Sequence, residues 1–269
     1  MFKRFWIFIF CIPFVIQATD LKPWFPRYLE IQPRFTYLHQ YYSKVDTNLG
    51  TQCKISKNDF YTGSIELAYD NICGELETTV ASTGGHHLAF DDVSGTFRYL
   101  LLDDVIGDPV SLVAGVTVTQ VFSPALRDIN TFYHGGIEAE FHLSIGKEVT
   151  SYNTWDSRTW GVAGLGIADH GSPWVHGELA WEKNWCERQH FRIFAEGIYG
   201  LGRHSLDLCI PFHGYGSIRH QSIDVGALYK YFFWDANSLT LGYAYRVHSK
   251  NCPKNVSSIF VSYMHPFGL

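Results

Sequence analysis

One short stretch of the sequence, "GGIEAEFHLSIGKEV" (135–149), carries residue types that could perform covalent catalysis. Within it, His142 stands two positions before Ser144. A serine hydroxyl becomes a nucleophile when a neighbouring imidazole takes its proton, and a third polar group fixes the imidazole tautomer. The spacing therefore permits a serine hydrolase, provided that these side chains meet.

The same stretch alternates strictly between apolar and polar residues, which is the pattern of a β-strand with two different faces. The polar face carries Glu138 and Glu140 together with His142 and Ser144, whereas the other face is apolar from 137 to 145. A one-residue slip would reverse every side chain, so turning the histidine toward an apolar environment would turn both glutamates with it. The pattern predicts that His142 and Ser144 lie in a polar interior and are not a catalytic pair.

Period-two alternation recurs from Tyr28 onward in twelve stretches, separated by the Asp, Asn, Gly and Pro residues that tight turns require. Aromatic residues stand at both ends of the apolar faces, as in "WVHGELAWEKNW" (174–185), and the opposite faces carry charges at mid-stretch. These charged residues are Arg34, Glu66, Arg98, Glu138, Glu140, Glu178, Arg192, Glu196, Asp224 and Arg246. Such charges must face water or one another, so we expect them to line the lumen of a barrel rather than the core of a soluble sandwich.

The pattern as a whole resembles the transmembrane β-barrels of Gram-negative outer membranes, over residues 28–269. Tyr263 and Phe267 share the apolar face of the last strand, just before Leu269, as in the strand that the outer-membrane assembly machinery reads. The segments "LKPWFPRYLEIQPR" and "HGYGSIRHQSIDVG" are also similar to conserved hypothetical outer-membrane proteins of chlamydia-type bacteria. The resemblance implies an all-β fold, an antiparallel barrel of about 12 strands in the bacterial outer membrane, with membrane lipids and the assembly machinery as partners.

The segment "FHLSIG" (141–146) resembles the His-x-Ser-x-Gly pattern of outer-membrane phospholipase A, itself a barrel. This resemblance implies that His142 is the base and Ser144 the nucleophile, with Asn153 or Asp156 as the orienting group and calcium as a cofactor. The sequence departs from that family in two respects. The family's His and Ser point toward lipid, and an Asn follows its Ser directly, where this chain has Ile145. We therefore expect no cofactor unless the hydrolase alternative holds.

The first residues predict export from the cytoplasm. A basic start precedes an apolar run of 12 residues and a small residue at Ala18, so residues 1–18 are predicted to be a cleaved signal peptide. Residues 19–27 are then a short extended lead-in, and residues 28–269 form the barrel. Removing Lys3 and Arg4 leaves 19 basic against 26 acidic residues, a formal charge of −7, which argues against nucleic acid as a partner.

Five cysteines remain beyond residue 18, and an exported protein meets an oxidising compartment. Cys209 and Cys252 both fall in long connections on the outer side, so we predict a disulfide between them, with Cys53 as the competing partner. His86 and His87 lie in a Gly-flanked loop without a second ligand cluster, so the sequence predicts no metal site.

Three functions remain open at this point. The protein could be a narrow small-solute channel, a structural or surface protein of the envelope with a plugged lumen, or an acyl hydrolase. The expected lumen mixes both signs of charge and could be cross-linked by salt bridges, whereas a channel more often shows one sign of charge in a row.

Overall fold

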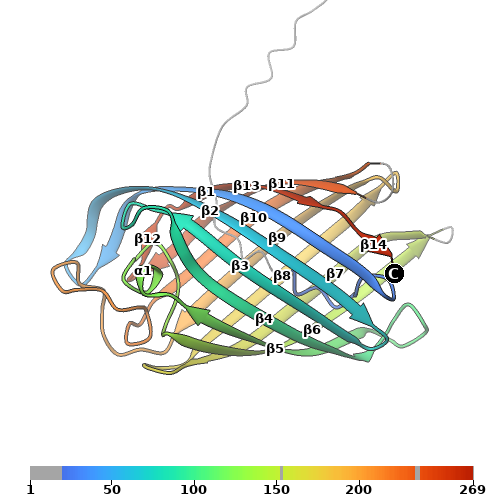
Figure 1. Ribbon diagram of the computed structural model, residues 1–269, viewed down its shortest axis with the longest axis horizontal. Coiled ribbons are helices and arrows are strands. Elements are labelled where there is room, and N and C mark those ends of the chain that lie inside the picture. The colour runs from blue at the N-terminus through green and yellow to red at the C-terminus, as the bar shows by residue number, and fades with distance from the viewer. Residues whose placement is uncertain (1–19, 152–153, 234–236, 269) are drawn as a thin grey trace, which may run out of the picture.

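The computed structural model describes residues 20–151, 154–233 and 237–268, and they form one antiparallel sheet that closes into a barrel (Figure 1). Twelve long strands cross it: β1 (Glu30–Thr47), β2 (Gly50–Tyr69), β3 (Ile72–Ser82), β4 (Ala89–Leu102), β5 (Ser111–Val121), β6 (Ile137–Ser151), β7 (Thr154–Ala168), β8 (Trp174–Trp185), β9 (Gln189–Gly200), β10 (Gln221–Phe232), β11 (Ser238–Lys250) and β13 (Ser257–Met264). The short strands β12 (Pro253–Lys254) and β14 (Phe267–Gly268) pair with β1, and a four-residue helix, α1 (Ser123–Leu126), follows β5.

Closure of the barrel depends on β1, which pairs with β2 on one side and with β13 on the other. Phe35 shows this directly, because it stands opposite Gly63 in β2 and opposite Tyr263 in β13. Every other long strand pairs with its neighbours in sequence order. The prediction of a twelve-stranded antiparallel barrel is confirmed.

The two ends of the barrel differ in the length of their connections. One end, the loop end, has the connections 83–88, 122–136, 169–173 and 201–220. The other, the turn end, has short turns such as 70–71 and 186–188, together with the start of β1 and the end of the described chain. The connections after the third, fifth, seventh and ninth strands thus all lie at the loop end.

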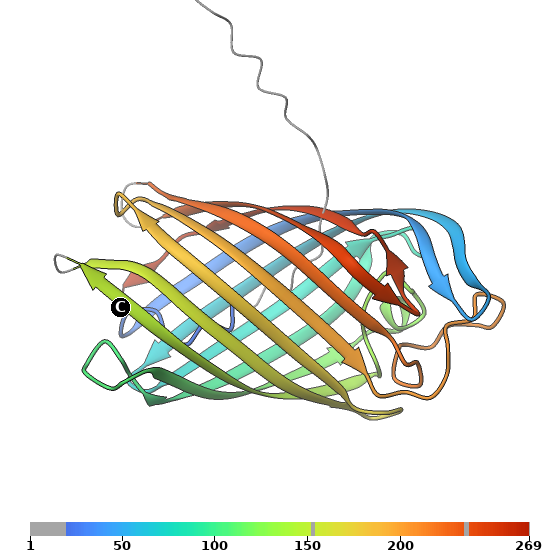
Figure 2. The ribbon, with the colours of Figure 1, turned by 180° about the vertical axis from the view of Figure 1, so that it is seen from behind.

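Two pairs of strands form long hairpins, β1 with β2 and β6 with β7. The first connection is a tight turn after Thr47, because β1 and β2 continue past the neighbouring strands, as Figure 2 shows. The segment after the sixth strand is likewise paired, down to Ser151 opposite Thr154. Strands six and seven are therefore consecutive strands of one hairpin, and the number of long strands stays at twelve.

The two faces of the wall differ as the alternation requires. Along β6, Phe141, Leu143 and Ile145 are each more than half exposed on the outside, whereas His142 and Ser144 between them are buried. With no water in the bilayer core, an apolar outer face and an internally hydrogen-bonded sheet are what a spanning structure needs. The outer face of this barrel thus suits contact with lipid.

Among the described residues, no helix combines the length and the apolar character that crossing a membrane requires.

The segment before β1 lies inside the barrel. Leu21 is 4% exposed and Trp24 is 6% exposed, and the segment has no regular secondary structure. Residues 20–27 were expected only as an extended lead-in to the barrel, so their position in the lumen is a finding of the structure. The predicted signal peptide, 1–18, lies outside the described residues.

A charged side chain on the outer face should destabilise the barrel by an amount that depends on its depth in the membrane. Phe141 lies in the middle of the part of β6 that pairs with β5, whereas Val149 lies on the same face of β6 beyond the last β5 pair, Ser111 with Gly146. Phe141→Arg should lower the free energy of unfolding by about 2 to 4 kcal/mol, and Val149→Arg by about 0 to 1 kcal/mol. Denaturant titration in lipid vesicles measures both. Equal costs at the two positions would contradict the placement of the lipid-facing band.

Candidate functional site

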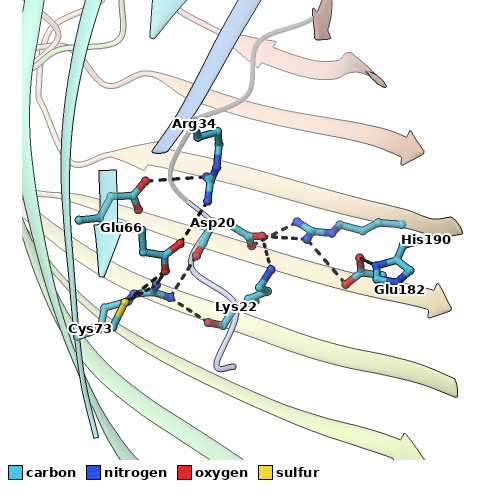
Figure 3. A network of polar contacts seen from close by, with 10 residues as sticks. Asp20, Lys22, Arg34, Glu66, Cys73, Glu182 and His190 are labelled. Atoms are coloured by element: carbon cyan, nitrogen blue, oxygen red, sulfur yellow. Dashed lines mark hydrogen bonds and ion pairs between the residues drawn. The ribbon is translucent and has the colours of Figure 1, made fainter. Parts of the chain in front are cut away.

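The lumen is occupied by the segment Asp20–Trp24, hereafter the lumen segment, which binds the wall through charged groups (Figure 3). The Asp20 carboxylate pairs with Arg192 of β9 at 3.0 Å and with Lys22 at 3.0 Å. Arg98 of β4 donates to the backbone carbonyl oxygens of Asp20 and Lys22, at 3.2 and 3.1 Å. The lumen segment is therefore held from two walls, β4 and β9.

Arg98 also binds the wall on its other side. Its second guanidinium nitrogen donates to Glu66 of β2 and to the sulfur of Cys73 in β3, the latter at 3.2 Å. Glu66 in turn accepts from Arg34 of β1 at 3.3 Å. Arg98 is only 1% exposed, and both of its terminal guanidinium nitrogens are bound by protein groups, whereas its Nε forms no hydrogen bond within the described residues. One buried cation thus connects the lumen segment to four neighbouring strands.

Trp24 fixes the other end of the lumen segment. Its indole Nε1 donates to Asp104, in the connection between β4 and β5, at 3.0 Å. Its ring packs edge-on against Trp160 with a centroid separation of 5.8 Å, and Arg158 lies 4.8 Å from its ring centroid. The segment therefore combines ionic contacts in mid-lumen with an aromatic anchor toward the turn end.

Gly146 explains why the wall can accept this anchor. A Cβ at this position would lie 2.7 Å from side-chain atoms of Pro23 and Trp24. Real Cβ atoms do not approach so closely, so a larger residue here would force the lumen segment to move. The glycine of the "HLSIG" motif thus serves close packing against the lumen segment.

Two cavities lie on either side of the lumen segment, and Leu21 lines both. The loop-side cavity, of about 220 Å³, reaches the connection 122–136, and the turn-side cavity, of about 120 Å³, reaches the opposite ends of β1, β10 and β11. The lumen segment therefore divides the space within the barrel.

A histidine lies between two carboxylates near this division. His176 of β8 contacts Glu140 of β6 at 3.1 Å through Nδ1 and Glu196 of β9 at 3.3 Å through Nε2. Trp174 donates its indole N–H to the second oxygen of Glu140 at 3.1 Å. Because Glu196 lines both cavities, this bridge stands at their boundary.

The charged residues that were expected in the lumen are divided between the two cavities and the contacts of the lumen segment. Those lining the loop-side cavity are Glu138, Glu140, Glu196, Asp224 and Arg246, and those lining the turn-side cavity are Arg34, Glu178, Arg192 and again Glu196. Glu66 and Arg98 belong to the network around the lumen segment. Sequence reasoning missed the partners in the lumen segment itself, although two charges and a tryptophan within "DLKPW" were a signal that this stretch is more than a linker.

The structure does not assemble the hydrolase candidates. His142 and Ser144 are 3% and 0% exposed on the polar face of β6, and no hydrogen bond joins them among the described residues. Asp156 lies twelve residues after Ser144 in the chain, near the start of β7. Its carboxylate pairs with Lys183 at 2.6 Å. Asn153 lies outside the described residues. Of the two candidates for the third member of a triad, the described one, Asp156, is therefore paired with Lys183 and not with His142.

The predicted disulfide between Cys209 and Cys252 is not formed in this structure, where all five described cysteines are free. Cys252 is buried, and its thiol donates to the backbone carbonyl of Gln221 at 3.2 Å, whereas Cys209 is exposed. The expectation took two loops at the same rim to be close, without information on which way each side chain points.

The remaining candidate residues lie at the end of the chain and in the loops. Tyr263 and Phe267 are about half exposed on the outer face, and Leu269 lies outside the described residues. In the part of the chain that the structure describes, no group of three or more His, Cys, Asp or Glu side chains is arranged to hold a metal ion.

The fold has counterparts among solved structures. The COG4313 outer membrane channel from Pseudomonas putida F1 is similar over 93% of this chain and 100% of that chain, with a TM-score of 0.67 and 10% sequence identity. The NanC porin is similar over 85% of this chain and 98% of that chain, with a TM-score of 0.58 and 7% identity. No protein-family model and no curated protein sequence matches the chain. The protein thus has the fold of a bacterial outer-membrane β-barrel.

Arg98 generates a stability prediction. Arg98→Met leaves Glu66 buried without its strongest partner and releases the two carbonyl groups of the lumen segment, so the free energy of unfolding should fall by about 3 to 5 kcal/mol. Arg188→Met, at an exposed turn, should change it by less than about 0.5 kcal/mol. Denaturant titration in vesicles compares the two. An Arg98→Met barrel as stable as the Arg188→Met barrel would refute the central role of this guanidinium.

Proposed function

We propose that the protein is an outer-membrane channel for small solutes whose lumen is closed by its own segment Asp20–Trp24. The observation that carries the proposal is the pair of cavities, about 220 and 120 Å³, that this segment separates inside a polar-lined barrel. A barrel with a purely structural role has no need of cavities on both sides of one segment of chain in its lumen. The similarity to outer-membrane channels supports the fold on which the proposal depends.

The contacts of the lumen segment favour a movable closure. Among the backbone hydrogen bonds of the described residues, none joins residues 20–26 to a strand by their own N–H groups. The segment is held by side chains: the Asp20 carboxylate, the Arg98 guanidinium and the Trp24 indole. Such contacts can be exchanged for water and for other lumenal charges without breaking the sheet, so opening costs far less than unfolding.

The size of the lumen limits the solutes. The two cavities have volumes of about 220 and 120 Å³, so only ions and small molecules could pass once the segment moves. The charges of the wall narrow the path further, because Arg192 of β9 pairs both with Glu182 of the adjacent strand β8 and with Asp20 of the lumen segment.

We also infer two further properties that the sequence indicated. The outward-facing Tyr263 and Phe267 at the end of the chain fit a strand read by the outer-membrane assembly machinery. The similarity of two segments to envelope proteins of chlamydia-type bacteria would place the channel in such an envelope. A phospholipase A-like activity is not favoured, since His142 and Ser144 are buried on the lumen side without an assembled triad.

Gly146 provides the test of closure. Gly146→Val should displace Pro23 and Trp24 and open the lumen, because a Cβ there collides with both side chains. In planar bilayers, the wild-type protein should be closed most of the time, and the Gly146→Val protein should show stable ohmic steps. Trp24→Ala, which removes the anchor without adding a clash, should shift the protein in the same direction.

The matched control is Gly95→Val, because a Cβ at Gly95 meets no atom within 4 Å. This variant should conduct like the wild type. A difference in gel mobility between unheated and boiled samples verifies that each variant is a folded barrel. If folded Gly146→Val and Trp24→Ala barrels are both as silent as the wild type, the channel proposal is wrong.

A further inference from the structure

The charges around the loop-side cavity do not balance. Besides Glu77, which interacts with Arg34, five carboxylates line it, from Asp92, Glu138, Glu140, Glu196 and Asp224, against one guanidinium, that of Arg246. Arg246 is bound by Asp224 through two hydrogen bonds of 2.7 and 2.8 Å, so each largely neutralises the other. Among the described residues no lysine lines this cavity, whereas Lys22 and Lys230 line the turn-side cavity.

Neutral donors position part of this negative charge without cancelling it. The hydroxyl of Tyr133 donates to Asp92 at 2.8 Å, and the backbone N–H groups of His134 and Gly135 donate to Glu138. Even with His176 protonated between Glu140 and Glu196, the carboxylates remain in excess. The cavity therefore has oriented acceptors and a negative potential.

A buried histidine adds an acceptor beside these carboxylates. His134 lines the cavity and is 4% exposed, and its ring stacks on Trp174 with a centroid separation of 3.8 Å. Its Nε2 lies 3.2 Å from Nε2 of His220, but its Nδ1 forms no hydrogen bond within the described protein, the nearest carboxylate oxygen being that of Glu138 at 3.8 Å. Burial lowers the pKa of His220 to about 3, so this second imidazole adds no positive charge at neutral pH.

The side chain of Arg246 shows how this cavity binds a cationic group. The Arg246 guanidinium lies 4.6 Å from the ring centroid of Phe132 while its N–H groups bind Asp224. An aromatic face together with a carboxylate is the combination that recognises organic cations. Tyr133, His134 and Trp174 supply further aromatic surface around the same space.

We propose that the loop-side cavity binds a small organic cation, with a primary ammonium or guanidinium group directed at Glu138 and His134 and an apolar part against the aromatic side chains. The proposal rests on the proposed function only in that this cation is the solute that the channel admits. An inorganic metal ion fits less well, because the described residues offer no group of three ligands arranged for one.

Titration calorimetry on the full-length protein in detergent tests the binding. The probes are n-butylamine and n-butylguanidine, which are cations at neutral pH, with n-butanol and butyrate as the neutral and anionic comparators of similar size. Both cations should bind saturably at one site per chain, and neither comparator should bind comparably. Glu138→Gln, which keeps an oxygen acceptor for the backbone N–H groups, should weaken cation binding by about tenfold or more.

Glu178→Gln is the matched control, because Glu178 lines the turn-side cavity alone. Its affinity for the cations should equal that of the wild type. Equal binding of butanol or butyrate, equal weakening by the two variants, or tighter binding of calcium than of either organic cation would each overturn the inference, as would absence of binding in both the wild type and Gly146→Val.

This experiment separates the inference from the proposed channel. Cation binding by a protein that never conducts, even as the folded Gly146→Val variant, would leave the site standing and remove the channel. Conductance without cation binding would leave the channel proposal standing and remove the cation site.

Discussion

Satisfying one buried guanidinium organises the interior of this barrel. Arg98 is 1% exposed, and a charge in that position is tolerated only if nearly all of its N–H groups find acceptors. Glu66 and Cys73 supply acceptors from the wall for one terminal nitrogen, and the carbonyl groups of Asp20 and Lys22 supply those for the other, so that only Nε is without a partner among the described residues. The wall and the lumen segment are thus complementary parts of one electrostatic unit, and the division of the lumen follows from it.

The same reasoning gives meaning to the motif that first suggested catalysis. In "HLSIG", His142 and Ser144 face inward because the alternation of β6 leaves no other choice, and Gly146 is small because Trp24 packs against it. A serine nucleophile at position 144 would point into the barrel and not toward lipid. The spacing of His142, Ser144 and Gly146 therefore follows from the period of the strand, and the glycine follows from packing against the lumen segment.

Much of the fold could be predicted because period two reports directly which face of a strand meets lipid. That rule placed Phe141 outside and Glu138 inside from sequence alone. The rule is silent on irregular segments, which have no period, and on contacts between residues distant in sequence, such as Asp20 with Arg192, 172 positions apart. Turn-forming residues also failed to mark the true end of β1, since paired strands can continue past the membrane wherever a hairpin partner is available. The cysteine pairing failed for a related reason, because a shared rim does not fix side-chain direction.

The central claim, that residues 20–24 close the lumen from within, can be measured through the reactivity of thiols. A charged, water-soluble maleimide applied to folded Leu21→Cys protein in detergent, followed by peptide mapping, compares position 21 with the native cysteines. Cys53 and Cys209 are exposed and should be labelled, whereas Cys73 and Cys252 are buried and should not be. The account predicts that the thiol at position 21 is protected like Cys73 and becomes reactive when Gly146→Val is added. Labelling at position 21 as fast as at Cys53 in the otherwise wild-type barrel would contradict it.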